Sequence, residues 1–297
     1  VILGTLLFMG KKYIFDFIAQ SKSNQSKVTI FIHGSRSAAV YVLPKRYQSK
    51  LGLHSVSEYE EDSHFSELAN ILQGQDPEKY VKKDFYVFGW GGALSFNVRK
   101  NLAKNLYHEM VTLLNFYKQR DGIAPAIKII TFSHGGNIAL QLSDFLPFIA
   151  HEEVLIDLTL IGSPVQAATE QMVECPQFSS VSVISSRGDV IQRMDPHNLY
   201  GPKRDKKTRA FSRRFFDVKD FNEEVQQKIT QYAVTINKKK LGHIDLFKSF
   251  MVHVPYVLSQ KPNVKLSEVL NVNIQDPGLI FNKVYNLSQS LQGKRTD

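Results

Sequence analysis

The serine best suited to chemistry in this sequence is Ser133, which stands between a β-branched run at 127–132 and a helix-forming run. His134-Gly135-Gly136 follows it directly. A strand that turns into a helix within a few residues needs small neighbours, because a Cβ at the turn would clash with the returning backbone. Such a turn exposes the serine hydroxyl and places the N–H of His134 at a helix N-terminus. The pattern predicts a nucleophilic serine, although S-x-G-G also occurs in ordinary strand-to-helix turns.

A serine hydroxyl is a weak nucleophile at neutral pH, so it needs an imidazole to take its proton and a carboxylate to orient that imidazole. His243 is the predicted base because it lies between the last predicted strand and the last helix, whereas His253 falls inside that helix and His197 in a basic insertion. Asp189 is the predicted acid because it follows a strand after a short turn, and Asp195 is the alternative. Taken singly, the histidine could instead cap a helix and the aspartate could form an Asx-turn.

A second polar element follows the apolar run 28–32, which ends in His33-Gly34-Ser35. Glycine lets the backbone approach a ligand, and N–H groups beyond it can bind a developing oxyanion. We expect the backbone N–H groups of Ser35 and His134 to form this oxyanion hole. The side chain of His33 is expected to hold the loop by hydrogen bonds rather than to react.

The elements that position these residues alternate between apolar runs and helical patterns. Strands are predicted at 28–32, 85–88, 127–132, 154–161, 180–185 and 232–236. Helices are predicted at 64–72, with Asp62 or Ser63 as N-cap, at 97–120, from the turn after Ser133 to Phe145, and in a last stretch that ends near Pro255. Residues 41–62 are predicted to form a loop. This alternation predicts an α/β fold, a mostly parallel central sheet with helices on both faces. Ligands bind at the carboxyl ends of such strands, where the candidate residues are expected to meet. Trp90, after the second strand, and Gly135 are expected to support the pocket.

Composition bounds the class of protein. A chain of 297 residues with 43% hydrophobic content can bury the core of one α/β domain, which we place at 27–257. The single cysteine, Cys175, excludes an intramolecular disulfide and a cysteine-based zinc site, and we expect it to pack in the core. No residue pattern calls for a metal or a cofactor. Nothing indicates an oxidising compartment, and a cytoplasmic or membrane-associated location is expected.

The net charge of +9 is concentrated in part at 203–214, with three further lysines at 238–240. We expect a solvated basic loop at 203–214. An anionic membrane surface is a second partner that such a segment could contact. No nucleic-acid partner is expected, because no RNA- or DNA-binding motif accompanies the cluster.

The two ends of the chain are expected to lie outside the α/β domain. Residues 1–26 form an apolar start and a polar linker, and the ten apolar residues are too few to span a bilayer, which needs about 20. They could be the remnant of a signal or anchor segment, or an edge element docked on the domain. Residues 258–297 are predicted to form a C-terminal appendage.

Over residues 27–257 the chain resembles the α/β-hydrolase superfamily, and in particular its bacterial lipase- and esterase-like members with a Ser-His-Gly-Gly-Asn nucleophile elbow. The residues that carry the resemblance are this elbow, the His-Gly strand end, and Phe88-Gly89-Trp90-Gly91-Gly92 followed by Asn97, Arg99, Ala103 and Leu106. The sequence departs from the family pattern G-x-S-x-G at Thr131, which replaces the first glycine.

The resemblance implies a serine hydrolase that cleaves small-molecule or lipid carboxylic esters. Ser133 would form an acyl-enzyme, His243 would move protons, and Asp189 would orient His243. The N–H groups of Ser35 and His134 would bind the oxyanion. The segment 195–222 would act as a cap or lid. The alternative is a hydrolase-fold protein without catalysis that uses its basic segment to bind a partner or a membrane surface.

Overall fold

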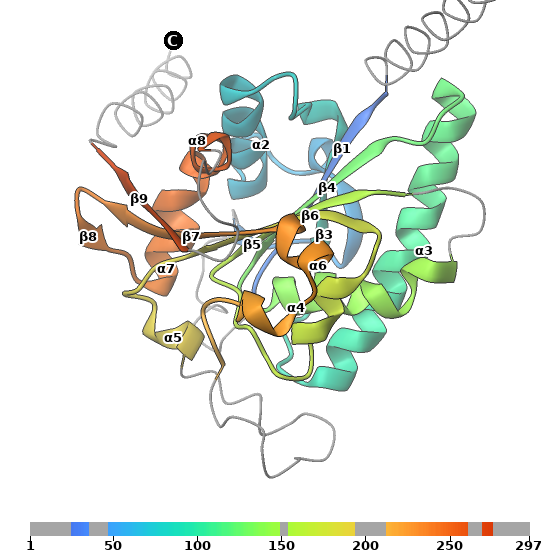
Figure 1. Cartoon of the computed structure of the whole chain (residues 1–297). Helices are drawn as coiled ribbons and strands as arrows, with labels where there is room; N and C mark the ends of the chain where they lie inside the picture. Colours follow the sequence, from blue (N-terminus) through green and yellow to red (C-terminus); the bar gives the residue numbers. More distant parts are fainter. Residues whose placement is uncertain (1–24, 36–46, 149–153, 194–211, 261–268, 276–297) are drawn as a thin grey trace, which may run out of the picture.

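The computed structural model describes residues 25–35, 47–148, 154–193, 212–260 and 269–275. Its centre is a nine-stranded, mostly parallel sheet flanked by helices (Figure 1). The α/β architecture with a mostly parallel sheet, expected from the alternation of strands and helices, is confirmed. Most of the segment expected as a cap, residues 195–211, lies outside the described residues, as do residues 1–24.

The strands are β1 Lys27–Ile32, β2 Gly52–Ser55, β3 Phe85–Gly89, β4 Ala126–Phe132, β5 Ile156–Ile161, β6 Phe178–Ser185, β7 Ile229–Ile236, β8 Lys239–Lys240 and β9 Val269–Ile274. Their order is β2-β3-β1-β4-β5-β6-β7-β8, and β9 pairs with β7. Only β2 and β8 run antiparallel to their neighbours among these strands. The chain adds β3 on one side of β1 and then crosses to add β4 on the other. Open sheets bind ligands beside such a reversal of strand order.

The inner strands β1, β4 and β5 are largely buried on both faces, as the continuous apolar runs predicted. In β1, Ile30 and Ile32 pack into one core and Phe31 packs into the other. All three side chains are fully buried. The inner part of the sheet therefore lies between two apolar layers, whereas β2 is half-buried and β8 is exposed.

The helices are α2 His64–Gln75, α3 Phe96–Asp121, α4 Gly135–Gln141, α5 Val190–Arg193, α6 Glu223–Lys228, α7 His243–Asp245 and α8 Val254–Ser259. Side chains of α3, α4 and α6 pack in one core, and side chains of α2 and α8 pack in the other (Figure 1). The hydroxyl of Ser63 accepts a hydrogen bond from the N–H of Ser66 at 3.2 Å, so the predicted start of α2 is confirmed. Gly122, with φ of 76°, ends α3 one residue beyond Asp121.

Three strands were missed by the sequence analysis, and the shortest of them is β8. The segment 41–62, predicted as a loop, contains β2, which pairs with β3 from Gly52↔Gly89 to Ser55↔Tyr86. The segment 258–297, predicted as an appendage, contributes β9, which pairs with β7 along its whole length. The predicted separation of 258–297 from the α/β domain is therefore wrong for residues 269–274.

Two helix ends were also misplaced. The helix after Ser133 ends at Gln141 rather than at Phe145, and single 3₁₀ turns continue the chain. The last helix does not end near Pro255 but reaches Ser259, because the proline occupies the first turn of α8, where no backbone N–H is needed.

Candidate active site

The turn between β4 and α4 places Ser133 in a strained conformation. Its φ is 54°, a region that residues other than glycine rarely adopt. A Cβ on Gly135 would lie 2.5 Å from the carbonyl oxygen of Ile32 and 2.6 Å from that of His33. A Cβ on Gly34 would lie 2.8 Å from the Cβ of Ser133. The turn therefore packs directly against the end of β1, and both glycines are needed for that approach.

Thr131, where the family pattern has a glycine, is accommodated inside β4. Its side chain is fully buried, and its hydroxyl donates to the carbonyl oxygen of Thr159 at 3.1 Å. The N–H of Ser133 donates to the carbonyl oxygen of Ile161 at 2.9 Å, which holds the turn to β5. The strand-to-helix turn forms without a glycine two residues before the serine.

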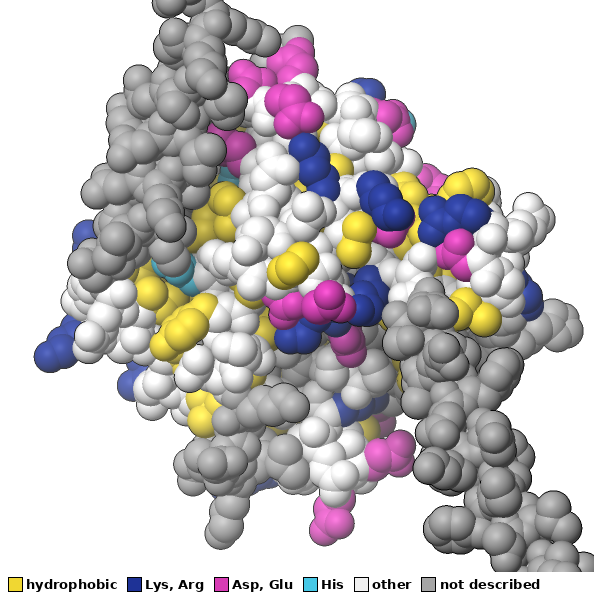
Figure 2. Space-filling view, turned by 90° about the horizontal axis from the view of Figure 1, so that it is seen from above, with side chains coloured by type: hydrophobic (Ala, Val, Ile, Leu, Met, Phe, Trp, Pro, Cys, Tyr) yellow, Lys and Arg dark blue, Asp and Glu magenta, His cyan; other side chains and the backbone are white. Residues whose placement is uncertain are grey.

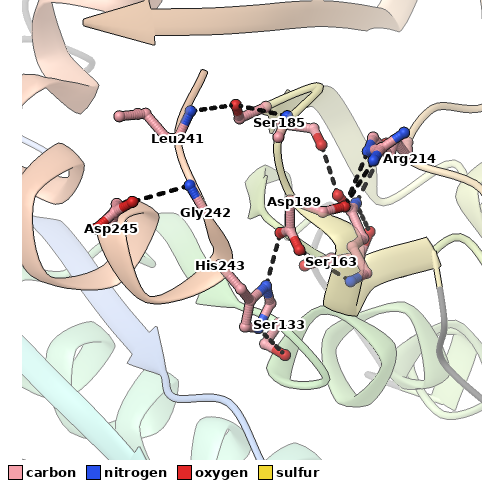
Figure 3. A network of polar contacts seen from close by, with 12 residues as sticks. Ser133, Ser163, Ser185, Asp189, Arg214, Leu241, Gly242, His243 and Asp245 are labelled. Carbon is pink, nitrogen blue, oxygen red and sulfur yellow. Dashed lines mark hydrogen bonds and ion pairs between the residues drawn. The ribbon is translucent and has the colours of Figure 1, made fainter. Parts of the chain in front are cut away.

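The side chains of Ser133, His243 and Asp189 form one hydrogen-bonded chain (Figure 3). Nε2 of His243 lies 3.0 Å from Oγ of Ser133, and Nδ1 lies 2.6 Å from Oδ2 of Asp189. With Nδ1 protonated and donating to the carboxylate, Nε2 is left to accept the serine proton. The contact expected between histidine and serine is present, and Asp189 is on the other ring nitrogen as expected.

The carboxylate of Asp189 is fully buried and uses both oxygens. Oδ2 faces His243, while Oδ1 accepts a hydrogen bond from the N–H of Gln192 at 2.9 Å. The acid thus also starts the short helix α5, so the structural role considered for it exists beside the contact with the base. Gly242, rather than the histidine, is the N-cap of α7.

A row of aromatic rings begins at the imidazole of His243. The ring of Phe132 lies 4.8 Å from it between centroids, and Phe247 lies 4.9 Å from Phe132. His64 continues this row at 4.5 Å from Phe247. The ring of Phe132 restricts the rotation of the His243 imidazole, and Phe247 packs against Phe132.

The loop after β1 is held by the side chain of His33, as predicted. Its Nδ1 lies 2.7 Å from the carbonyl oxygen of Gly34, and its Nε2 accepts from the N–H of Trp90 at 3.2 Å and lies 2.8 Å from Oγ of Ser49. The indole N–H of Trp90 donates to the carbonyl oxygen of His33 at 2.8 Å. These bonds fix the loop that carries Ser35 beside the serine.

The two residues expected to form the oxyanion hole lie on the segments that flank the serine hydroxyl. His134 immediately precedes α4 and is buried. Ser35 follows Gly34, and its buried hydroxyl has no hydrogen-bond partner among the described residues. The hole itself stays a prediction, because it is defined by the position of a bound oxygen.

Of the rival residues Asp195, His197 and His253, the structure describes His253. His253 is buried in the last helical segment, where it packs against Phe250. Asp195 and His197 lie outside the described residues.

The basic segment 203–214 was predicted to be a solvated loop. This prediction is wrong for Arg213 and Arg214, whose side chains bond to other parts of the protein. Arg213 pairs with Glu170 and Asp217.

Two residues at this site were missed by the sequence analysis. The side chain of Gln192 bonds to the ends of β5 and β6, and Arg214 donates two hydrogen bonds to the backbone of Asp189 (Figure 3). Their contacts join segments that are distant in sequence, so spacing gives no signal for them. A glutamine three residues after an aspartate does not by itself indicate a contact between the two.

No family model and no curated protein matches this chain. In the described ranges, no cluster of three or more His, Cys, Asp or Glu side chains could hold a metal ion. No helix in those ranges combines the length and hydropathy that a membrane crossing requires. Cys175 is buried, as expected for a core residue.

Proposed function

We propose that this protein is a serine hydrolase of the α/β-hydrolase type that cleaves carboxylic esters through an acyl-enzyme. The observation that carries the proposal is the continuous chain from Oγ of Ser133 through His243 to the buried carboxylate of Asp189, at 3.0 and 2.6 Å. The chain order Ser, Asp, His and the strand-to-helix turn at the serine support the same assignment.

In the acylation step, Oγ of Ser133 attacks the ester carbonyl carbon while Nε2 of His243 takes the hydroxyl proton. The carbonyl π electrons move to oxygen, and the N–H groups of Ser35 and His134 stabilise the resulting oxyanion. Asp189 keeps the proton on Nδ1 and stabilises the imidazolium cation. When the carbonyl re-forms, the bond to the leaving alkoxide breaks and His243 gives it the proton.

Deacylation repeats these steps with water. His243 removes a proton from the water, whose oxygen attacks the acyl carbon of the Ser133 ester. The second oxyanion collapses, the bond to Oγ breaks, and the proton returns from His243 to the serine. The products are a carboxylic acid and the free enzyme, so the cycle needs no cofactor.

The surface beside the triad favours substrates with an apolar part. Val190 and Ile191 follow the acid directly, and Ile244 follows the base; their side chains are 57%, 58% and 53% exposed. The two short helices that carry them, α5 and α7, are in contact. Exposed branched side chains at this position favour an acyl chain or a lipid alcohol over a sugar ester.

The alternative, a binding module without catalysis, would use its basic segment, and residues 203–211 of that segment lie outside the described residues. On the face drawn in Figure 2, acidic and basic side chains of the described residues are interspersed, so that face offers no extended region of one sign. A binding module also gives no reason for a buried carboxylate aligned with an imidazole and a strained serine. Both features favour the hydrolase.

A fluorophosphonate probe tests the proposal, because it reacts only with an activated serine. We expect one label per chain on the peptide that contains Ser133, and none in Ser133→Ala or His243→Ala. A folded wild-type protein that takes up no label would refute the hydrolase and leave the binding module as the better account.

A further inference from the structure

Besides the hydrogen bond from its own N–H to the carbonyl oxygen of Ser186, Asp189 is held at three points. His243 contacts Oδ2 of Asp189, the N–H of Gln192 donates to Oδ1, and Arg214 donates to the backbone carbonyl oxygen. The last two contacts touch neither the base nor the serine. These two contacts therefore hold Asp189 in place without taking part in the proposed reaction.

Gln192 fixes the acid to the sheet. Its side chain is 1% exposed and its amide is fully used. Nε2 donates to the carbonyl oxygen of Ser163 beyond the end of β5, and Oε1 accepts from the hydroxyl of Ser185 at the end of β6, both at 2.6 Å. The backbone N–H that holds Oδ1 of Asp189 is therefore tied to two neighbouring strands.

Arg214 fixes the same loop from another segment. Its Nε and Nη2 donate to the carbonyl oxygen of Asp189 at 3.1 and 2.7 Å, so the planar guanidinium makes a two-point contact (Figure 3). The carbonyl oxygen of Arg214 in turn lies 3.4 Å from Nε2 of Gln192. A lysine has a single donor group and cannot reproduce the fork.

We propose that Arg214 and Gln192 are positioning residues that hold the carboxylate of Asp189 in line with Nδ1 of His243. The inference rests on the proposed function, in which Asp189 orients the base. Neither residue would touch the substrate, so both would act on the rate of the chemical step rather than on substrate binding.

Misplacement of a catalytic group by about 1 Å costs on the order of 100-fold in rate. When the fork to the backbone of Asp189 is lost, the carbonyl group of Asp189 loses both donors, and the carboxylate is held in place with fewer contacts and can turn away from the imidazole. We expect Arg214→Met to lower kcat by about 10- to 100-fold with KM within about 2-fold of wild type. The kcat of Arg214→Lys should lie between those of wild type and Arg214→Met.

Arg213→Met is the matched control, because it removes a cation from the neighbouring position that pairs with Glu170 and Asp217 instead. Its kcat should stay within about 2-fold of wild type. Gln192→Glu, which keeps the size of the side chain but loses the donor to Ser163, should behave like Arg214→Met. Melting temperatures are measured for all variants, and kinetics are compared well below each transition.

A proton resonance provides a readout that does not depend on hydrolysis. The Nδ1 proton shared between His243 and Asp189 should give a far-downfield signal that is absent in His243→Ala. We expect it to shift or broaden in Arg214→Met and to stay unchanged in Arg213→Met. If wild type neither labels at Ser133 nor turns over esters, the proposed function fails while this signal still tests the positioning.

An unchanged downfield signal in Arg214→Met would overturn the inference, as would an unchanged kcat in an active enzyme. A change confined to KM, or an equal loss of kcat in Arg213→Met, would also contradict it. The inference is supported if kcat falls, and the signal of the shared proton changes, progressively from wild type through Arg214→Lys to Arg214→Met.

Discussion

The backbone N–H of Leu241 donates to the side-chain oxygen of Ser186 at 2.8 Å, across 55 positions of sequence. Leu241 lies two residues before the base His243, and Ser186 lies three residues before the acid Asp189. Both Leu241 and Ser186 are buried. The loops that carry His243 and Asp189 are therefore joined by a hydrogen bond in addition to the contact between these two side chains.

We expect Ser186→Ala to lower the free energy of unfolding by about 1–3 kcal/mol, because a buried N–H loses its partner. It should also lower kcat, since the base loop is released from the acid loop. Ser259→Ala is the control, because Ser259 is exposed and bonds to its own helical turn. Denaturant unfolding and ester turnover measure the two effects; a Ser186→Ala protein equal to the control in both would contradict this link.

Gly135 is expected to tolerate no side chain. A Cβ there would meet two backbone oxygens of β1 and the following residue at 2.5 and 2.6 Å, and backbone cannot move aside cheaply. Gly135→Ala should cost about 1–3 kcal/mol of unfolding free energy and most of the activity. Gly74→Ala is the matched control: its Cβ would meet nothing within 4 Å, so it should be neutral or stabilise α2 by about 0.5–1 kcal/mol. Thermal melts of both variants decide; equal behaviour would refute the tight elbow.

Asp189→Asn should keep the fold and lower kcat by about 10⁴-fold, because an amide favours the wrong imidazole tautomer. Two aspartates serve as controls. Asp217→Asn alters an exposed partner of Arg213, and Asp195→Asn alters the rival acid, which lies outside the described residues. Both should retain kcat within about 2-fold. A large loss in Asp195→Asn with normal activity in Asp189→Asn would move the acid to Asp195.

The sequence alone predicts those features of the fold and the site that depend on residues close together in the chain. The strands that carry Ser133 and Asp189 were predicted because an apolar run buried on both faces is visible without knowledge of its neighbours. The start of α2 at His64 was predicted, with Asp62 or Ser63 as its N-cap, because a cap is a contact over three residues; the structure has Ser63 in that role. The meeting of serine, acid and base followed from the rule that parallel strands end at one edge.

Features that depend on a distant partner were missed. The strand β9 is recognisable only through its pairing with β7, and β2 only through its register on β3. Arg214 was counted with a solvated basic segment, because its bonds to the backbone of Asp189 span 25 positions. Composition describes a side chain's charge but not the carbonyl group that it meets.

Burial lowers the pKa of His253, whose Nε2 is buried without a hydrogen-bond partner in the described residues. The folded state therefore binds this proton less readily than the unfolded chain, whose histidine has a pKa of about 6.5. Stability from this group is complete above pH 6.5 and falls by up to about 1.4 kcal/mol per pH unit below it.

We expect His253→Leu to unfold with a weaker dependence on pH below about pH 6.5 than wild type. His108→Gln, which replaces an exposed histidine of α3, is the matched control. Ester turnover of both should stay near wild type, because neither lies at the triad. Denaturation midpoints measured across this range test the prediction. A wild-type pH dependence in His253→Leu would show that another group is responsible.

The apolar side chains beside the triad predict a preference for long acyl chains. Ile191→Ser should raise KM for esters of long-chain acids by several-fold and leave short-chain esters unchanged, because only a long chain reaches α5. Leu155→Ser is the control, since Leu155 is also about half exposed but precedes β5, at the opposite end of the strands from the triad. An equal effect of Ile191→Ser on short and long esters would count against this surface as part of the substrate site.

The central claim is that Ser133 becomes acylated during turnover. Rapid mixing of the enzyme with a p-nitrophenyl ester, followed by acid quench and peptide mass analysis, measures this directly. The account predicts a nitrophenolate burst of about one equivalent per chain where deacylation is slow, with the acyl mass on the peptide that contains Ser133 and no burst in Ser133→Ala. Hydrolysis that persists in Ser133→Ala, or an acyl group found on another residue, would contradict it.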